Sequence, residues 1–225
     1  MSHLDIEITQ LRAETIKMWG LVNLQLKKGK EALTTLDKDL AAEIMLSEKR
    51  VNAYELKLDR DCENIFALFN PVAIDLRFVL AVLKINNNLE RTGDIVNAIA
   101  QFVIDADTNF DKHLLHITGV LEMYEAAISM MADVLDAFEK EDTAKARRIF
   151  KQDELLDEIN LRASSIIAEY IRDHNANIES ALYFFSIIRK LERVGDQAKN
   201  MAEEVIFYIE AKVLKHRKEK EKNEQ

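Results

Sequence analysis

Apolar residues recur at helical spacing along most of the chain, and the breaks between these runs divide it into six segments. The first run covers residues 3–36, with apolar residues at Leu4, Ile8, Leu11, Ile16, Met18, Val22 and Leu26. Apolar positions with this spacing line one face of an amphipathic α-helix. Similar runs cover about 37–70, 71–106, 114–140, 142–173 and a last stretch that continues from 178 into the charged tail. The pattern therefore predicts six long helices.

Several of the expected boundaries carry residues that favour the start or the end of a helix. Asp37 and Asp142 can cap the second and fifth helices, because an aspartate side chain accepts a hydrogen bond from a free N–H of the first turn. Asn70 and Pro71 stop the second helix. We expect Asn70 to cap the third helix and Pro71 to be its first residue, where a missing N–H does no harm.

The two halves of the chain repeat each other. The motif LERTGD at Leu89–Asp94 returns as LERVGD at Leu191–Asp196. The matching core positions are Ile85 and Ile187, Leu89 and Leu191, Thr92 and Val194, Val96 and Ala198, Ile99 and Met201, and Val103 and Val205. Such self-similarity indicates a duplicated unit, and the polar stretch 105–113 separates the copies. We predict an all-α fold of two tandem, pseudo-symmetric three-helix bundles, in residues 1–108 and 109–211, followed by a charged, fraying tail in 212–225.

Composition supports this fold and limits the partners. Five glycines and one proline are few for 225 residues, whereas turn-rich β folds need more of both. The formal net charge of −9 disfavours a nucleic acid, because binding to its phosphates needs a positive field. The sequence shows no apolar run long enough to cross a bilayer and no secretory signal peptide. The single cysteine, Cys62, cannot form an intrachain disulfide, so we expect a cytoplasmic protein without membrane insertion.

The repeated motif places two carboxylates one turn apart on one helix face, as Glu90 with Asp94 and as Glu192 with Asp196. The preceding helix of each half carries a polar row at similar spacing. The rows are Glu48, Asn52, Glu55 and Asp59 in the first half, and Asp153, Asp157, Asn160 and Ser164 in the second. Each half therefore has two polar rows on helices that are adjacent in sequence.

An antiparallel hairpin brings these rows to the same height, because residues at equal distances from its turn lie opposite each other. The first turn is at Pro71, and the second is predicted at 174–177. The residues that fall opposite each other are Glu48 with Asp94, Asn52 with Glu90, Asp153 with Asp196, and Asp157 with Glu192. At the usual helix separation of roughly 8–10 Å, both rows can reach one ligand.

Carboxylates that lie close together repel each other, so a site that is not fully solvated needs protons or a cation. Oxygen ligands favour Mg²⁺, Ca²⁺, Mn²⁺ or ferric iron. We therefore predict metal sites formed by Glu48, Asn52, Glu90, Asp94, Asp153, Asp157, Glu192 and Asp196. We expect weaker binding in the first half, where Asn52 is neutral. A solvated polar surface and a contact surface for a partner protein stay open as alternatives.

The chain resembles the PhoU family over residues 15–210. The similar runs of the first repeat are Val51–Glu55, Pro71–Arg77, Leu83–Ile85 and Leu89–Asp94, and those of the second include Ala137–Phe138, Leu156–Asp157, Leu191–Asp196 and Asn200–Glu203. The resemblance implies a cytoplasmic, often dimeric regulator. Such a protein links the ATPase of a phosphate ABC transporter to a sensor histidine kinase, damps phosphate-starvation signalling and restrains phosphate uptake.

The resemblance also implies a metal. Some members carry multinuclear iron or zinc clusters on Glu/Asp-x-x-x-Asp motifs, which match Glu90 with Asp94, Glu192 with Asp196, and Asp153 with Asp157, while Glu48 and Asn52 fill the remaining position. Many members have a histidine directly after Gly-Asp. Ile95 and Gln197 stand there in this chain and provide no imidazole nitrogen, so the metal stays open between iron or zinc and Mg, Ca or Mn.

We expect no enzymatic activity. The Glu-x-x-His pairs of di-iron oxidases are absent from the sequence, as is a glycine-rich loop that could hold a phosphate. Cys62 has no candidate histidine base. Two other functions stay open: a stand-alone partner of a sodium–phosphate symporter or low-affinity phosphate transporter, and a metal-free helical adaptor in an unrelated pathway.

Overall fold

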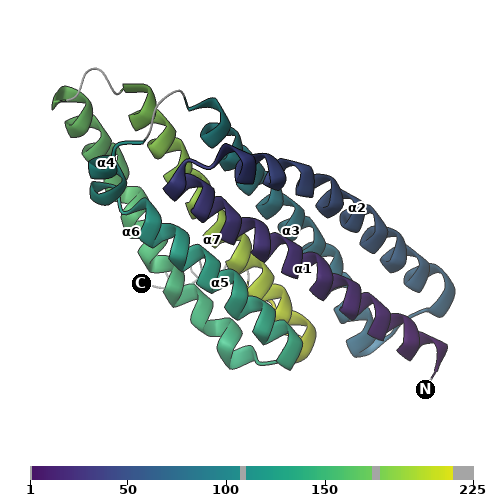
Figure 1. Ribbon diagram of the computed structural model, residues 1–225. Helices are drawn as coiled ribbons and strands as arrows, with labels where there is room; N and C mark the ends of the chain where they lie inside the picture. Colours follow the sequence, from purple (N-terminus) through teal and green to yellow (C-terminus); the bar gives the residue numbers. More distant parts are fainter. Residues whose placement is uncertain (1, 107–109, 174–177, 215–225) are drawn as a thin grey trace, which may run out of the picture.

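The computed structural model describes residues 2–106, 110–173 and 178–214, and helices are the only regular secondary structure within these ranges (Figure 1). They are α1 His3–Thr35, α2 Lys38–Phe69, α3 Ala73–Asp105, α4 Lys112–Ile117, α5 Val120–Lys140, α6 Thr143–Asp173 and α7 Ile178–Glu210. The predicted all-α class is confirmed. The predicted turn at 174–177 and residues 215–225 of the predicted tail lie outside the described residues.

Both aspartates predicted as helix caps serve as caps. Asp37 accepts a hydrogen bond from the backbone N–H of Leu40 at 2.9 Å, at the start of α2. Asp142 accepts one from the N–H of Lys145 at 2.9 Å, at the start of α6. Each bond satisfies a backbone donor that the helix itself leaves without a partner.

The connection between α2 and α3 differs from the prediction. Asn70 ends α2 in the left-handed backbone region, with φ of 46°, instead of capping α3. Val72 is the N-cap residue of α3, and the helix begins at Ala73, so Pro71 lies before the helix and not at its first position. Asparagine is one of the few residues that tolerate the left-handed region, which suits it to end a helix.

The predicted helix at 114–140 is wrong as a single element, because the chain breaks it into α4 and α5. Gly119 lies at the break with φ of 67°, a conformation that glycine adopts without the steric cost of a side chain. Thr118 marks the end of α4, and its hydroxyl donates to the carbonyl oxygen of Leu114 at 2.7 Å. The last helix also stops earlier than predicted, at Glu210.

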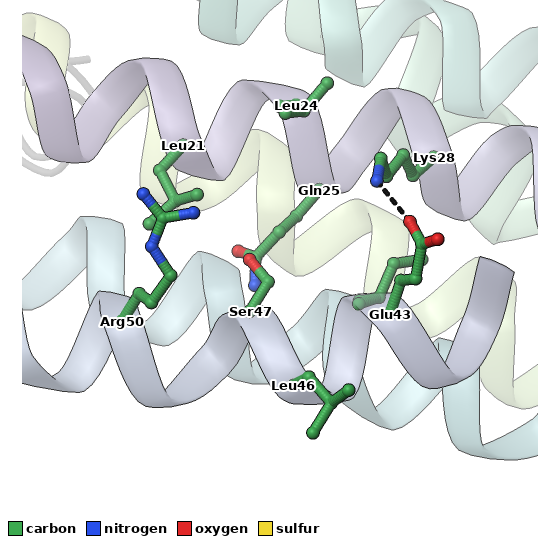
Figure 2. Close-up of a pocket in the computed structure, with 9 residues that line it drawn as sticks. Leu21, Leu24, Gln25, Lys28, Glu43, Leu46, Ser47 and Arg50 are labelled. Carbon is green, nitrogen blue, oxygen red and sulfur yellow. Dashed lines mark hydrogen bonds and ion pairs between the residues drawn. The ribbon is translucent and has the colours of Figure 1, made fainter.

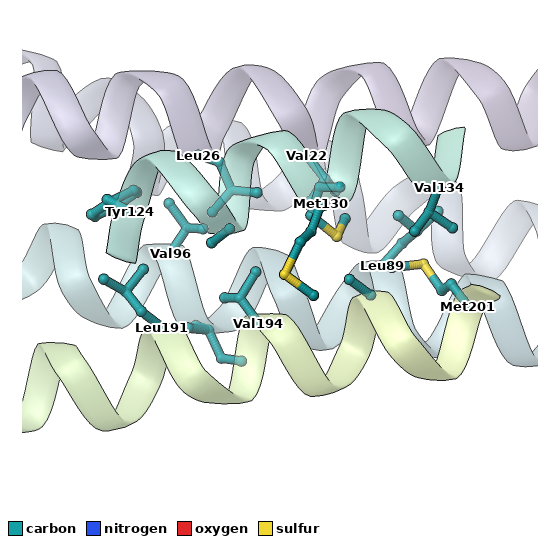
Figure 3. Packing of buried hydrophobic residues seen from close by; sticks show 14 of the residues in the cluster. Val22, Leu26, Leu89, Val96, Tyr124, Met130, Val134, Leu191, Val194 and Met201 are labelled. Carbon is teal, nitrogen blue, oxygen red and sulfur yellow. The ribbon is translucent and has the colours of Figure 1, made fainter. Parts of the chain in front are cut away.

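The helices form two groups, α1–α3 and α5–α7, which share one core. Figure 1 shows α2 and α6 on opposite flanks, with the other long helices between them, and α3 packs along α7 while α1 packs along α5. Figure 3 shows side chains of four helices meeting in this core, among them Val22, Leu26, Leu89, Val96, Met130, Val134, Leu191 and Val194. The two predicted bundles are therefore joined by a continuous apolar layer.

Aromatic and polar contacts also cross between the two groups. Trp19 of α1 donates its indole N–H to the carbonyl oxygen of Met131 in α5 at 3.2 Å. The guanidinium of Arg12 lies 4.6 Å from the centre of the Phe78 ring and donates to the carbonyl oxygen of Phe138 at 3.2 Å. These contacts fix the two groups relative to each other.

None of the helices in the described ranges combines the length and the apolar character that a bilayer crossing requires.

Candidate functional site

Four carboxylates gather between α2 and α3, and we call them the first acidic face: Glu48 and Glu55 of α2, with Glu90 and Asp94 of α3. The side chain of Glu48 lies near that of Asp94, as the hairpin register predicts, and near that of Asn97, and both affect its pKa. Asn52 is exposed on α2 between Glu48 and Glu55. Asp59, the last member of the predicted row, accepts a hydrogen bond from Asn86 at 2.9 Å.

The carboxylates of the first acidic face raise each other's pKa values. Burial raises the pKa of Glu90 to about 7, and the negative charges of Asp94 and Glu55 add to this effect. The pKa of Glu48 is raised by burial and then by Asp94, and that of Glu55 by burial and then by nearby carboxylates. In the ranges that the structure describes, no lysine or arginine forms an ion pair with Glu48, Glu90 or Asp94.

The second acidic face lies between α6 and α7 and consists of Asp153, Asp157, Glu192 and Asp196. The pKa of Glu192 is raised by burial first, and then by the charges of Asp196 and Asp157. All four predicted ligands of the second half therefore lie near one another. Asp153 is buried, with 3% of its surface exposed, whereas Asp157 is exposed.

Lys199 lies within the second acidic face, and the sequence analysis did not identify it. Its ammonium group forms ion pairs with Asp153 of α6 and, at 2.8 Å, with Asp196 of α7. Burial alone would lower the pKa of Lys199, but the bonds to the two aspartates outweigh it and raise the pKa. The available signal was its position three residues after Asp196 on one helix face.

Gly195 allows α6 to approach α7 closely at this face. A Cβ atom on Gly195 would lie 2.5 Å from Oδ1 of Asp153 and 2.7 Å from Cδ2 of Leu156, both too short for non-bonded atoms. The equivalent glycine of the first repeat, Gly93, is less tightly held, since its Cβ atom would lie 3.3 Å from Val51. The glycine of the repeated motif thus serves close helix packing.

The two faces differ in how they suit the metal that the family likeness implies. Within the described ranges, no three His, Cys, Asp or Glu side chains form a ready-made metal cluster. The first acidic face offers oxygen donors from Glu48, Glu90 and Asp94 and lacks a paired cation, so its residues fit a hard cation. Such a cation would supply the positive charge that offsets the repulsion between these carboxylates. The second face already holds the ammonium of Lys199 between two of its carboxylates and does not fit as it stands.

A separate cavity of about 280 Å³ lies between α1 and α2 (Figure 2). Its lining includes Gln25, Ser47 and Arg50, and Figure 2 shows Lys28 paired with Glu43 at one end, at 2.6 Å. None of the predicted metal ligands lines this cavity. It is therefore distinct from both acidic faces.

These observations define a class of protein: an all-α, two-repeat protein with a shared core, in which each repeat carries a glycine-containing acidic motif on its last helical hairpin. The PhoU domain matches the chain twice, over residues 15–103 and 120–205. The chain belongs to the PhoU family.

Individual relatives agree with this assignment. The phosphate-specific transport system accessory protein PhoU homolog 1 of Thermotoga maritima is 32% identical over 216 residues, which cover 95% of this chain and 91% of the relative. The PhoU protein of Escherichia coli K12 is 30% identical over 210 residues, covering 93% and 86%. The family likeness seen in the sequence is confirmed.

Solved structures agree as well. The phosphate transport system regulatory protein PhoU from Streptococcus pneumoniae superposes with a TM-score of 0.85 at 28% identity, covering 94% of this chain and 99% of that one. PhoU from Pseudomonas aeruginosa gives a TM-score of 0.88 at 26% identity, covering 93% and 100%. The arrangement of helices in Figure 1 is thus the arrangement of this family.

Proposed function

We propose that this chain regulates phosphate uptake and phosphate-starvation signalling as an adaptor between a phosphate transporter and its sensor kinase. The observation that carries the proposal is likeness along nearly the whole chain to proteins named as phosphate-specific transport system accessory proteins. The family is one of regulatory accessory proteins and not of enzymes, so the proposed activity is binding.

The proposed partners are the ATPase of a phosphate ABC transporter and a sensor histidine kinase, with the protein acting in the cytoplasm, as a homodimer and as a negative regulator. The two repeats are proposed to span residues 1–108 and 109–211. A formal charge of −9 favours partner surfaces with positive charge, because complementary fields speed and orient association.

Metal binding on the first acidic face is the second part of the proposal, with ligands drawn from Glu48, Asn52, Glu90 and Asp94. The sequence also predicts Asp153, Asp157, Glu192 and Asp196 as ligands, but the ion pairs of Lys199 argue against a metal ion on that face. The raised pKa of Glu90 supports binding on the first acidic face, because a bound cation stabilises carboxylates that otherwise repel each other. Ile95 and Gln197 follow the two Gly-Asp motifs, so the donors are oxygens. Oxygen donors favour Mg²⁺, Mn²⁺ or Ca²⁺ over zinc.

Deletion of the gene tests the regulatory role. In phosphate-rich medium the deletion strain should take up phosphate faster than the parent and switch on a phosphate-starvation reporter, and a plasmid copy should reverse both effects. A pull-down with the purified transporter ATPase tests the adaptor role. If uptake and reporter stay at the parental level, the regulatory proposal is wrong. If the symporter or low-affinity transporter is captured instead of the ABC transporter's ATPase, the pathway is the alternative one.

A further inference from the structure

We infer that Lys199 is the resident cation of the second acidic face, so that this face binds no metal ion while the first acidic face stays open to one. The inference rests on the proposed metal binding and states which of the two faces binds. It reverses the ranking expected from the sequence, in which the second half was the stronger site.

The position of Lys199 is the first argument. Its ammonium group bridges Asp153 of α6 and Asp196 of α7, two residues that the hairpin register places at the same height. A metal ion bound between Asp153 and Asp196 would need these same oxygens. Lys199 and the metal therefore compete for one place, and a lysine on the same chain is always present at that place.

The burial of Asp153 is the second argument. A buried carboxylate without a partner is strongly destabilising, so the fold needs a positive charge beside it. Oδ1 of Asp153 is fully buried and has no hydrogen-bond partner among the described residues, which leaves the ion pair through Oδ2 as its compensation. Close packing places Oδ1 of Asp153 against Gly195 of α7, and the side chain is buried away from solvent.

The internal repeat provides the third argument, because it gives each residue of the second face a counterpart in the first. Each face has four carboxylates and one asparagine in its α2 or α6 row, Asn52 or Asn160. The place of Lys199 holds Asn97 in the first repeat, and the two rows also differ, since Asn52 matches Asp157 and Glu55 matches Asn160. Asn97 is neutral and lies near Glu48, whose pKa it lowers, so the first acidic face has no cation of its own at that place.

An exchange of these two residues tests the inference. The variants are Lys199→Asn and Asn97→Lys, and each introduces the residue that the other repeat carries. The probe is Mn²⁺, measured as bound metal per chain by equilibrium dialysis of the purified full-length protein, together with its melting temperature. The matched pairs Glu90→Gln/Asp94→Asn and Asp157→Asn/Glu192→Gln remove carboxylates from the first and second face respectively.

The wild-type protein should bind Mn²⁺. The Glu90→Gln/Asp94→Asn variant should lose this ion, and the Asp157→Asn/Glu192→Gln variant should keep it. Asn97→Lys should weaken Mn²⁺ binding at least tenfold. Lys199→Asn should melt at a lower temperature without metal and gain an additional Mn²⁺, which Asp157→Asn/Glu192→Gln removes again. Lys199→Arg keeps the charge and should gain no metal.

Two results would overturn the inference: wild-type Mn²⁺ that is lost with the second-face pair, or a folded Lys199→Asn protein that gains no metal. If Lys199→Asn fails to fold, the double variant Lys199→Asn/Asp153→Asn removes the buried negative charge as well. This double variant should fold and gain no metal. A double variant that stays unfolded would contradict the inference. If the wild-type protein binds no Mn²⁺, the proposal of a metal ion on the first acidic face is wrong. A gain of Mn²⁺ by Lys199→Asn in that case would still support the role of Lys199.

Discussion

Gly195 lies where α6 and α7 come closest on the second acidic face, and its substitution tests the packing there. Gly195→Ala would press a methyl group against Asp153 and Leu156, and overpacking of this kind costs about 1–3 kcal/mol. The control is Gly20→Ala in α1, where the added Cβ meets nothing within 4 Å and should stabilise by about 0.5–1 kcal/mol. Urea unfolding of both variants measures the difference. A Gly195→Ala protein as stable as Gly20→Ala would contradict the geometry.

Glu90 gives the first acidic face a pH dependence. The folded protein raises the pKa of Glu90 from 4.5 to about 7, so folding favours the protonated form. This contribution to stability is fully present below pH 4.5 and is lost as the pH rises through 7. In metal-free buffer, wild-type protein should therefore lose stability relative to Glu90→Gln across this window, on the order of 1 kcal/mol after solvent screening.

The measurement is the free energy of unfolding of both proteins at several pH values, with the exposed Glu139 changed to Gln as a control. Equal pH profiles for wild type and Glu90→Gln would show that the face is fully solvated. Added Mn²⁺ should flatten the wild-type profile, because a bound cation replaces the proton that Glu90 otherwise needs.

The sequence could predict which carboxylates meet, but not what neutralises them. The turn near Pro71 fixes the register of the first hairpin, so the pairing of Glu48 with Asp94 follows from counting residues. The role of Lys199 depends on where a long, flexible side chain ends. A lysine three residues after an aspartate is common on solvated helices, and nothing in the sequence showed that this one reaches Asp153 on the neighbouring helix.

At the scale of elements, Gly119 is the reason that α4 and α5 are separate helices. Its φ of 67° suits glycine, while other residues pay roughly 1–2 kcal/mol in the left-handed region. Gly119→Ala should therefore lower the free energy of unfolding by about that amount, and Gly119→Asn by less, because asparagine tolerates this conformation. Equal urea midpoints for wild type and Gly119→Ala would mean that the segment can run on as one helix.

Helix periodicity alone could not place this break. Leu114 and Val120 are both buried, so the apolar pattern continues across the break, and a single glycine is also tolerated inside helices. The turn at Asn70 and Pro71 was predicted in the right place, and the expected end of α2 there is confirmed, but Asn70 does not cap α3 and Pro71 is not its first residue. Either residue can stop a helix, and the choice between them depends on the backbone angles that packing of α2 against α3 imposes.

At the scale of the whole molecule, the shared core should make the two repeats unfold together. Trp19 is the single tryptophan of the chain, and it is buried between the groups with its indole bonded to Met131. Its fluorescence therefore reports on the contact between the groups, while circular dichroism at far-ultraviolet wavelengths reports on all helices. The two urea transitions should coincide, whereas a fluorescence change well ahead of the helix loss would show that the repeats separate first.

Removal of a large side chain from this contact should destabilise both groups. Phe138→Ala deletes a fully buried ring that stacks on Phe78 at 6.0 Å and should cost about 3–5 kcal/mol. The control Leu161→Ala changes a side chain that is 80% exposed and should change stability by less than about 0.5 kcal/mol. Calorimetry should show one transition for each variant, shifted strongly only for Phe138→Ala.

The all-α class and the duplication were predictable because apolar spacing and the repeated motif are local properties of the sequence. The joining of the repeats was not, since an apolar helix face does not say which other helix covers it. Two separate three-helix bundles would turn the core stripe of α3, from Ile85 to Val103, and its counterpart on α7 each toward its own bundle. The two stripes also meet each other across the shared core.

The two acidic faces differ in whether a lysine already occupies them, and one diffraction measurement tests this difference directly. Crystals of the wild-type protein soaked in Mn²⁺ should give an anomalous difference peak between α2 and α3, beside Glu48, Glu90 and Asp94. The space between Asp153 and Asp196 should show the ammonium of Lys199 and no such peak. A manganese peak between Asp153 and Asp196, with Lys199 turned away, would contradict the account.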